Sequence, residues 1–188
     1  MNGVDWTMDP GYGPKGDYPG YSDNAPGGRR WTYAQTQPHW HSTLRVGTGL
    51  GQQVGPTAAI TGSGTSATVD LSRALSGVSS ASRSLSLNPT SMTIRDRVVT
   101  KKAQTLSWGW MTDAGIAISG RTVTLTKSGR TLTLTWSGLP SGATITVEQV
   151  PVSLRYLTGS LTQLVAITIP ATTKLDLTTT AAWSQGAA

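Results

Sequence analysis

The sequence predicts a single all-β domain over residues 1–188, an antiparallel β-sandwich with a long ordered loop near its N-terminus. After residue 43, polar and apolar residues alternate in many short segments, as they do in strands with one solvated and one buried face. Gly, Ser and Pro separate these segments at intervals of about 8–12 residues, a spacing typical of sandwiches and barrels. A length of 188 residues is enough to enclose one hydrophobic core.

The N-terminal loop is expected over residues 9–38. This stretch is rich in Gly, Pro and Tyr, as in the letters DPGYGP at 9–14 and YPGY at 18–21. Gly and Pro set turns and interrupt regular structure. Long loops in compact domains are usually functional or disordered, and the aromatic residues argue against disorder here. We therefore expect an ordered, functional loop.

The strands follow from the alternating pattern. Only residues 72–82 could hold a turn or two of helix, and their Ser and Gly content disfavours one. Residues 122–126 (TVTLT) and 131–136 (TLTLTW) alternate clearly, and the KSGR letters at 127–130 supply a turn, which predicts a hairpin. The same alternation predicts strands at residues 84–87, 92–98, 106–110, 145–147, 164–169 and 175–177.

Composition narrows the classes of partner. Fifteen Lys and Arg against nine acidic residues give a net charge of +6, which favours an anionic partner. The cations are scattered, without the basic run and interleaved aromatics that single-stranded nucleic acid requires, so we expect no nucleic acid. No apolar run approaches the roughly 18 residues that span a bilayer, and the first residues lack a secretory signal, so we expect no membrane. Without cysteine, a disulfide or a thiolate metal site is excluded.

The two histidines are the first candidates for chemistry. If residues 38–46 are extended, alternate side chains share one face of the strand. The polar face then carries His39, His41, Thr43 and Arg45, and the core face carries Trp40, Leu44 and Val46.

The same parity in residues 4–9 points Val4, Trp6 and Met8 inward and Asp5, Thr7 and Asp9 outward. A neutral imidazole and a carboxylate on adjacent strands can form part of a zinc site. The alternative is two surface histidines that hydrogen-bond to the backbone.

Asp96 lies at the same alternate positions as the apolar residues of 92–98, so its side chain should face inward. A buried carboxylate must be paired, and we therefore expect a structural role for Asp96.

Three motifs in this sequence resemble a known family. GVDWTMDPG at 3–11, GRRWTY at 28–33 and HSTL at 41–44, with Gln52 or Gln53 following, are similar in order and spacing to the opening of the C-terminal β-domain of heparinase II/III-like polysaccharide lyases. That domain typically contains "GVxWxxDPG", "GRRWxYYR" and "HNTLxxxGxxQ". The likeness continues at residues 67–72, 82–85, 92–98 and 108–112 and covers roughly residues 3–140.

The resemblance implies a supersandwich-like β-domain that works beside a helical toroid. In such enzymes the toroid carries most catalytic residues, and uronic-acid-containing polysaccharides are cleaved by β-elimination. A metal, usually zinc, is held in the β-domain by the aspartate of "DPG", the histidine of "HNT" and a histidine from an upstream strand. Carried over, Asp9 and His41 would be two ligands, and His39 is the candidate for a third.

The departures from the family pattern limit this expectation. Ser42 stands where the family has asparagine, Ala34 and Gln35 follow Tyr33 where the family often has Tyr-Arg, and His39 is extra. The upstream histidine strand and the catalytic helical toroid domain are absent from this chain. We therefore assign no catalytic residue and expect the chain alone to be inactive.

Three functions remain open. The first is the β-domain module of such a lyase, supplying a cleft wall and metal support to a toroid partner that acts on acidic polysaccharide. The second is a repurposed structural subunit, extracellular or periplasmic, that self-associates into a homo-oligomer through open sheet edges. The third is a stand-alone carbohydrate-binding domain. Residues of the N-terminal loop would stack on sugars and meet carboxylates; these candidates are Tyr12, Arg29, Arg30, Trp31 and Tyr33.

Overall fold

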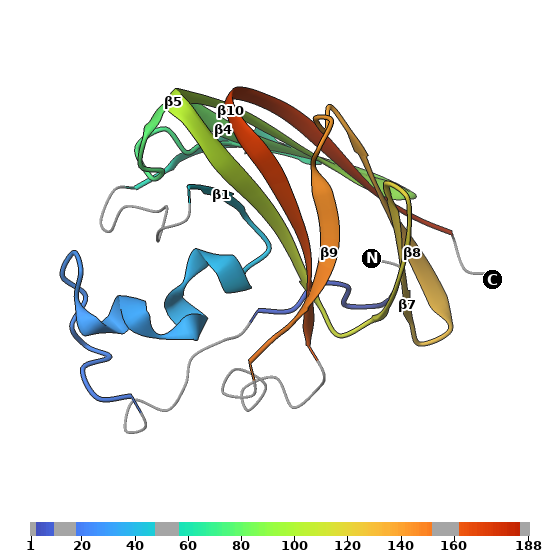
Figure 1. Ribbon diagram of the computed structural model, residues 1–188. Coiled ribbons are helices and arrows are strands. Elements are labelled where there is room, and N and C mark those ends of the chain that lie inside the picture. The colour runs from blue at the N-terminus through green and yellow to red at the C-terminus, as the bar shows by residue number, and fades with distance from the viewer. Residues whose placement is uncertain (1–2, 10–17, 48–56, 152–161, 185–188) are drawn as a thin grey trace.

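The computed structural model describes residues 3–9, 18–47, 57–151 and 162–184. Within them, three short 3-10 helices precede a ten-stranded antiparallel sheet (Figure 1). The helices are η2 (Arg29–Thr32), η3 (Ala34–Thr36) and η4 (Pro38–Trp40). The strands are β1 (Leu44–Val46), β2 (Ala59–Ser63), β3 (Ser66–Asp70), β4 (Val78–Asn88), β5 (Ser91–Thr112), β6 (Gly115–Ser119), β7 (Thr122–Lys127), β8 (Arg130–Ser137), β9 (Thr144–Gln149) and β10 (Gln163–Trp183). The predicted all-β antiparallel fold is confirmed.

Two long strands organise the sheet. The strand order is β2-β3-β4-β5-β10-β8-β7-β6, with β1 added to β5 and β9 added to β10. β5 and β10 pair along their length, from Ser91 opposite Ala182 to Thr112 opposite Gln163. β4 and β8 flank this pair at one end, and β1 and β9 flank it at the other. Figure 1 shows the resulting sheet strongly curved, and both halves contribute to one core.

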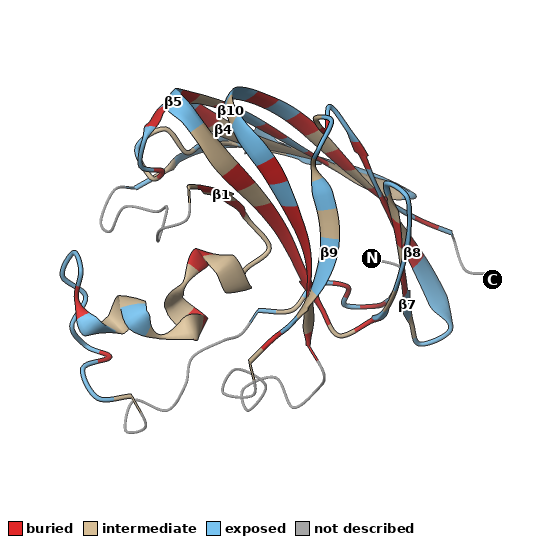
Figure 2. Cartoon of the chain, viewed as in Figure 1, coloured by how far each residue is buried: buried red, intermediate tan, exposed pale blue. Residues whose placement is uncertain are grey.

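The core is apolar and rich in tryptophan. It joins residues of β5, β7, β8 and β10 to the N-terminal segment, where Val4 and Trp6 are buried as predicted. The Trp110 indole N–H donates to the Trp6 carbonyl (3.1 Å), and the Lys127 ammonium donates to the Asp5 carbonyl (3.0 Å). These bonds hold the N-terminal segment against the sheet. Figure 2 shows buried and more exposed residues alternating along the long strands.

The predicted hairpin of residues 122–136 is confirmed as β7 and β8. Ser128 and Gly129 form the two-residue turn with positive φ values of 53° and 71°. Two such residues make the turn whose twist matches that of paired strands. Inward-facing Val123, Leu125, Leu132 and Leu134 are fully buried, and threonines occupy the outward positions.

Several of the other predicted strands are shorter than the strands in the structure. The segments predicted at 92–98 and 106–110 are parts of the single strand β5, and those at 164–169 and 175–177 are parts of β10. Pro170 suggested a break, but β10 accommodates it where the register shifts between Ile169 and Thr172, since proline is tolerated at bulges. β2, β3 and β6 lacked a clear alternating signal because they are mostly exposed.

The remaining N-terminal predictions concern turns and helices. Residues 72–82 hold no helix: one turn closes on the Leu71 carbonyl, and Val78 begins β4. Residues 18–38 of the predicted loop contain turns and 3-10 helices, held by contacts among the rings of Tyr18, Tyr21 and Tyr33. Over the described residues, none of the helices has the length and apolarity needed to cross a membrane.

Candidate functional site

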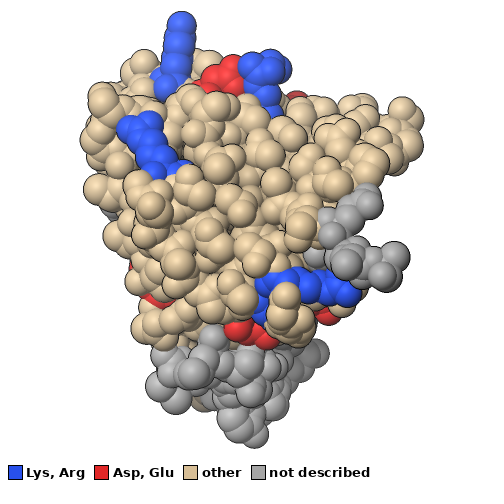
Figure 3. Space-filling view, turned by 90° about the vertical axis from the view of Figure 1, so that its right-hand side faces the viewer, with Lys and Arg blue, Asp and Glu red and all other residues tan. Residues whose placement is uncertain are grey.

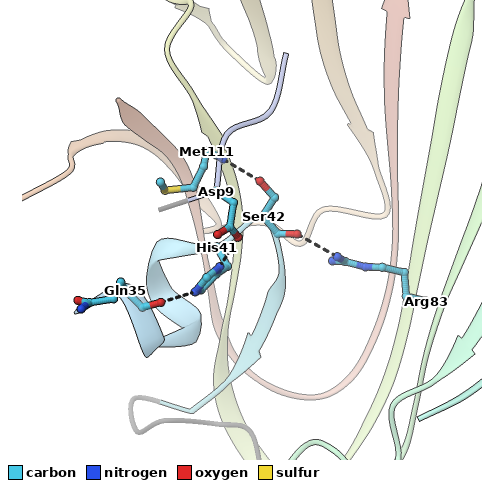
Figure 4. Close-up of polar contacts among 6 residues, drawn as sticks. All are labelled: Asp9, Gln35, His41, Ser42, Arg83 and Met111. Carbon is cyan, nitrogen blue, oxygen red and sulfur yellow. Dashed lines mark hydrogen bonds and ion pairs between the residues drawn. The ribbon is translucent and has the colours of Figure 1, made fainter. Parts of the chain in front are cut away.

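Two chain segments meet at the C-terminal end of β5, and one residue of that strand positions both. The Met8 N–H donates to the Met111 carbonyl (3.0 Å), which fixes the segment ending in Asp9. The Met111 N–H donates to the Ser42 hydroxyl oxygen (3.0 Å), which fixes the residue after His41. Asp9 and His41 are thereby brought side by side (Figure 4).

Asp9 and His41 are in direct contact. The distance from Asp9 Oδ2 to His41 Nδ1 is 2.8 Å, and His41 Nε2 lies 3.2 Å from the Gln35 carbonyl oxygen. A carbonyl only accepts, so in the tautomer with its hydrogen on Nε2 the ring donates to Gln35, and Nδ1 presents its lone pair toward Asp9. In the other tautomer Nδ1 carries the hydrogen and donates it to the Asp9 carboxylate. The Asp9 side chain is 70% exposed and that of His41 is 30% exposed, so solutes can reach the pair.

A buried ion pair supports the backbone next to His41. Arg83 contacts Asp96 through two hydrogen bonds, Nε to Oδ1 (2.7 Å) and Nη2 to Oδ2 (3.0 Å), and Asp96 is 0% exposed. The Arg83 Nη1 also donates to the Ser42 carbonyl (3.2 Å). The inward-facing, paired state predicted for Asp96 is confirmed. The ion pair thus links β4 and β5 to the site.

Gly109 allows the His41 segment to lie close to β5. Its N–H donates to the Thr43 carbonyl (2.9 Å). A Cβ at this position would lie 2.9 Å from the His41 carbonyl oxygen and 3.0 Å from a methyl group of Leu164. Only glycine leaves both neighbours where they are.

A depression of about 180 Å³ adjoins the Asp9–His41 pair. Arg30, Trp31, Tyr21, Gln35 and Thr36 complete its lining. The Arg30 guanidinium lies 4.8 Å from the Tyr21 ring centroid and 5.6 Å from that of Trp31, within the range of cation–π contacts. Arg30 Nε and Gln35 Nε2 are buried donors without a hydrogen-bond partner in the described part of the chain. The depression thus combines a cation and aromatic rings with an imidazole and a carboxylate.

The structure separates His39 from this pair. Residues 38–40 form η4 rather than a strand, since Pro38 begins a 3-10 turn, and extended backbone starts at His41. His39 Nε2 lies 2.7 Å from Glu148 Oε2, and its ring packs edge-on against Trp40. Leu44 and Val46 face the core as predicted. Among the described residues, no group of three His, Cys, Asp or Glu side chains is arranged to hold a metal ion.

The other predicted binding residues are dispersed. Arg29 is exposed, and its backbone N–H donates to the Asp23 carboxylate (3.1 Å). The Tyr33 hydroxyl donates to the Pro19 carbonyl (2.6 Å), so this ring holds the loop. Tyr12 lies outside the described residues.

Sequence reasoning missed several residues that build the site. Gln35, Ser42, Arg83 and Met111 act through backbone groups or through partners far away in the chain, which no local pattern reveals. Glu148 carried one usable signal, because it is the single glutamate of the chain.

Comparisons with known proteins support the fold. The sequence matches no family model and no curated protein. Among solved structures, a heparinase III gene product is similar over 84% of this chain, with a TM-score of 0.62 and 16% identity. A mutant of the heparan sulfate lyase HepC from Pedobacter heparinus is similar over 98% of this chain, with a TM-score of 0.64 and 15% identity. HepC itself is similar over 85%, with a TM-score of 0.58 and 15% identity.

This chain spans 25% of the heparinase III chain and 30% and 26% of the two HepC chains. At these identities the likeness shows a shared fold and no more.

Proposed function

We propose that this chain is a β-domain module of a heparinase II/III-like polysaccharide lyase. In this role it forms one wall of a cleft for acidic polysaccharide and supports a metal ion, while a helical toroid partner supplies the groups for β-elimination. The observation that carries the proposal is the 2.8 Å contact of Asp9 with His41 beside Arg30 and Trp31. It occurs on a fold similar to about a quarter of a heparinase III chain.

The Asp9–His41 pair suits zinc in its donor atoms. Zinc takes carboxylate oxygen and imidazole nitrogen at about 2.0–2.2 Å, and two ligand atoms of a tetrahedral site then lie roughly 3.3 Å apart. The present separation of 2.8 Å would have to widen by only about 0.5 Å. The hydrogen bond from His41 Nε2 to the Gln35 carbonyl is the kind of outer contact that orients a metal-bound histidine. When bound, zinc would supply positive charge at the cleft wall.

Two ligands do not complete a zinc site, so we assign the rest to water and the partner domain. Asp9 and His41 are accessible enough for such a partner to reach them. His39 is paired with Glu148, and we leave it out of the ligand set.

The depression beside the pair suits an acidic sugar. The Arg30 guanidinium can meet a carboxylate or a sulfate, and the Trp31 ring offers a surface for stacking on a sugar. Figure 3 looks onto the side where β7 and β8 lie, opposite η2–η4 in Figure 1, and charged residues occupy only the margins of that view.

Zinc content and polysaccharide binding test the proposal directly. We expect purified protein to retain zinc through dialysis in a heparin-free buffer, and Asp9→Ala and His41→Ala to lose it, as measured by elemental analysis. His39→Ala is the matched control and should retain the metal. Retention of zinc by both Asp9→Ala and His41→Ala would refute the ligand assignment.

Binding of heparan sulfate, measured by calorimetry, should weaken in Arg30→Ala and persist in the control Arg97→Ala, an exposed arginine that does not line the depression. The chain alone should produce no unsaturated product, read by its ultraviolet absorbance. Clear turnover would contradict the division of labour proposed here.

Self-association is a second candidate, favoured by the sheet edges. β2 and β6 are the terminal strands of the main strand order, and Ile60 and Ile118 on them are 69% and 40% exposed. Open edges with exposed apolar side chains can pair with another copy. Light scattering during size-exclusion chromatography separates the candidates, since a monodisperse monomer would eliminate the structural subunit. A stand-alone carbohydrate-binding domain would instead bind polysaccharide as a monomer without any toroid partner.

A further inference from the structure

A second polar cavity lies on the other side of the His39 segment. Its volume is about 100 Å³, and it is bounded by η4, β1, β5, β9 and β10. The polar residues that line it include His39, Thr43, Arg45, Ser107 and Glu148. It shares no lining residue with the depression beside Asp9 and His41.

Arg45 is the cation of this cavity, and its guanidinium is only partly satisfied. Arg45 lies between the buried Leu44 and Val46 on β1, so its side chain leaves the opposite face of the strand. Its Nε donates to the Ser107 hydroxyl oxygen (3.1 Å). Within the described residues, the two terminal nitrogens have no hydrogen-bond or ion-pair partner. Burial lowers the pKa of Arg45 below its ordinary value, and the charge of Glu148 offsets part of this effect.

Glu148 does not neutralise Arg45 through a direct contact. One carboxylate oxygen, Oε2, lies 2.7 Å from His39 Nε2. The second oxygen, Oε1, has no partner in the described part of the chain. The cavity therefore presents two sets of hydrogen-bonding groups without a partner in the described residues. These are the terminal N–H donors of the half-buried Arg45 guanidinium and one acceptor oxygen of the Glu148 carboxylate.

We propose that this cavity binds a hydroxy-carboxylate of the uronic acid class, with its carboxylate on the terminal nitrogens of Arg45 and a hydroxyl on Glu148. A planar carboxylate matches two parallel donors of a guanidinium. The Glu148 charge disfavours a dianion and accepts a hydrogen bond from a sugar hydroxyl. A volume of about 100 Å³ admits the carboxylate group and its nearest hydroxyl, since a water molecule takes about 30 Å³.

This inference adds a second sugar-acid subsite to the proposed polysaccharide module, and in that sense it rests on the proposed function. Its test nevertheless uses a free monosaccharide and measures NMR shifts of the backbone amides around Arg45. Absence of zinc or of polysaccharide binding would overturn the module without changing this titration.

The experiment is an NMR titration of the full chain with sodium glucuronate. We expect saturable shifts of backbone amides around Arg45 and Glu148, at least tenfold weaker binding of acetate, and none of glucose. Arg45→Gln should weaken glucuronate binding at these amides at least tenfold. Arg97→Gln removes an exposed guanidinium that does not line the cavity and should leave the affinity unchanged.

A second variant keeps the test decisive if Arg45→Gln does not fold. Glu148→Gln retains the size of the side chain and should reduce the preference for glucuronate over acetate. Equal affinity for glucuronate and acetate in the unmodified chain, or shifts confined to residues 30–36, would overturn the proposal.

Discussion

We expect loss of the buried Arg83–Asp96 ion pair to lower the free energy of unfolding more than loss of an exposed ion pair. We choose Asp96→Asn as the perturbation, because it keeps the size of the side chain and removes its charge. Arg83 would then remain mostly buried, with a side chain 14% exposed, and without a counterion. Removing one partner of a buried pair costs about 3–5 kcal/mol. Arg83 retains slight contact with solvent and its bond to the Ser42 carbonyl, so we expect the lower end, about 3 kcal/mol.

The expected loss is large enough to measure in two ways. For a domain of this size, each kcal/mol lowers the melting temperature by about 2–4 °C, so the variant should melt about 6–12 °C lower. Urea unfolding followed by tryptophan fluorescence gives the free energy directly, since Trp6, Trp108, Trp110, Trp136 and Trp183 are buried in the core. The slope of free energy against urea should stay the same.

The matched control is Asp176→Asn. Asp176 pairs with Arg95 through two bonds of 2.7 Å, but both side chains are about half exposed. Exposed pairs contribute little, so its loss should be at most about a third of that of Asp96→Asn. Equal losses in the two variants would refute the argument from burial.

A double variant separates the effect of an unpaired charge on stability from the effect of lost packing. R83M with D96L replaces the pair by apolar side chains, which often restores the stability lost on breaking such a pair. We expect recovery of most of the loss, with a deficit of about 1 kcal/mol from the missing bond to the Ser42 carbonyl.

Three further outcomes are expected. Gly129→Ala should destabilise the hairpin by about 1 kcal/mol or more in urea unfolding, because φ at this turn position is +71°. Gly109→Ala should leave the protein folded by circular dichroism but shift the NMR signals of the His41 ring, because the new Cβ meets the His41 carbonyl. The hydrogen bond from Arg95 is the main cause that lowers the pKa of Asp176 below its ordinary value. The stability from this carboxylate is therefore present above about pH 4 and lost as the pH falls through the lower folded-state pKa, so urea midpoints of Asp176→Asn should vary less between pH 2 and 5.

The alternation of inward and outward side chains along the two extended segments predicted part of the site. It placed Val4 and Trp6 inside and Asp9 outside, and it placed Leu44 inside, so the contact between the first segment and the histidine segment was foreseeable. It failed at His39, because Pro38 starts a 3-10 turn and turns rotate side chains out of the strand register.

The continuity of the long strands was not predictable from local signals. Pro170 interrupts the sequence of β10, and residues 99–105 of β5 lack a clean alternation. Pairing between the two strands over most of their length outweighs these local defects, with bulges absorbing the mismatch. The contact of Arg83 with the Ser42 carbonyl is equally non-local, because it joins residues 41 positions apart that only the folded chain brings together. The contact of His41 with the Gln35 carbonyl is local, but it depends on the 3-10 turns between them, which the extended-strand prediction left out.

β5 contributes both to the buried ion pair and to the candidate site. Its first half carries Asp96 in the core, and its second half carries Gly109 and Met111, which hold the His41 and Asp9 segments. Arg83 contacts both Asp96 and the Ser42 carbonyl, so two consecutive contacts connect the buried ion pair to the residue after His41. The Asp9 and His41 side chains of the site are accessible, at 70% and 30% exposed. Asp9 and His41 thus lie exposed on a segment that the sheet fixes from beneath, which is the premise on which the proposed cleft wall depends.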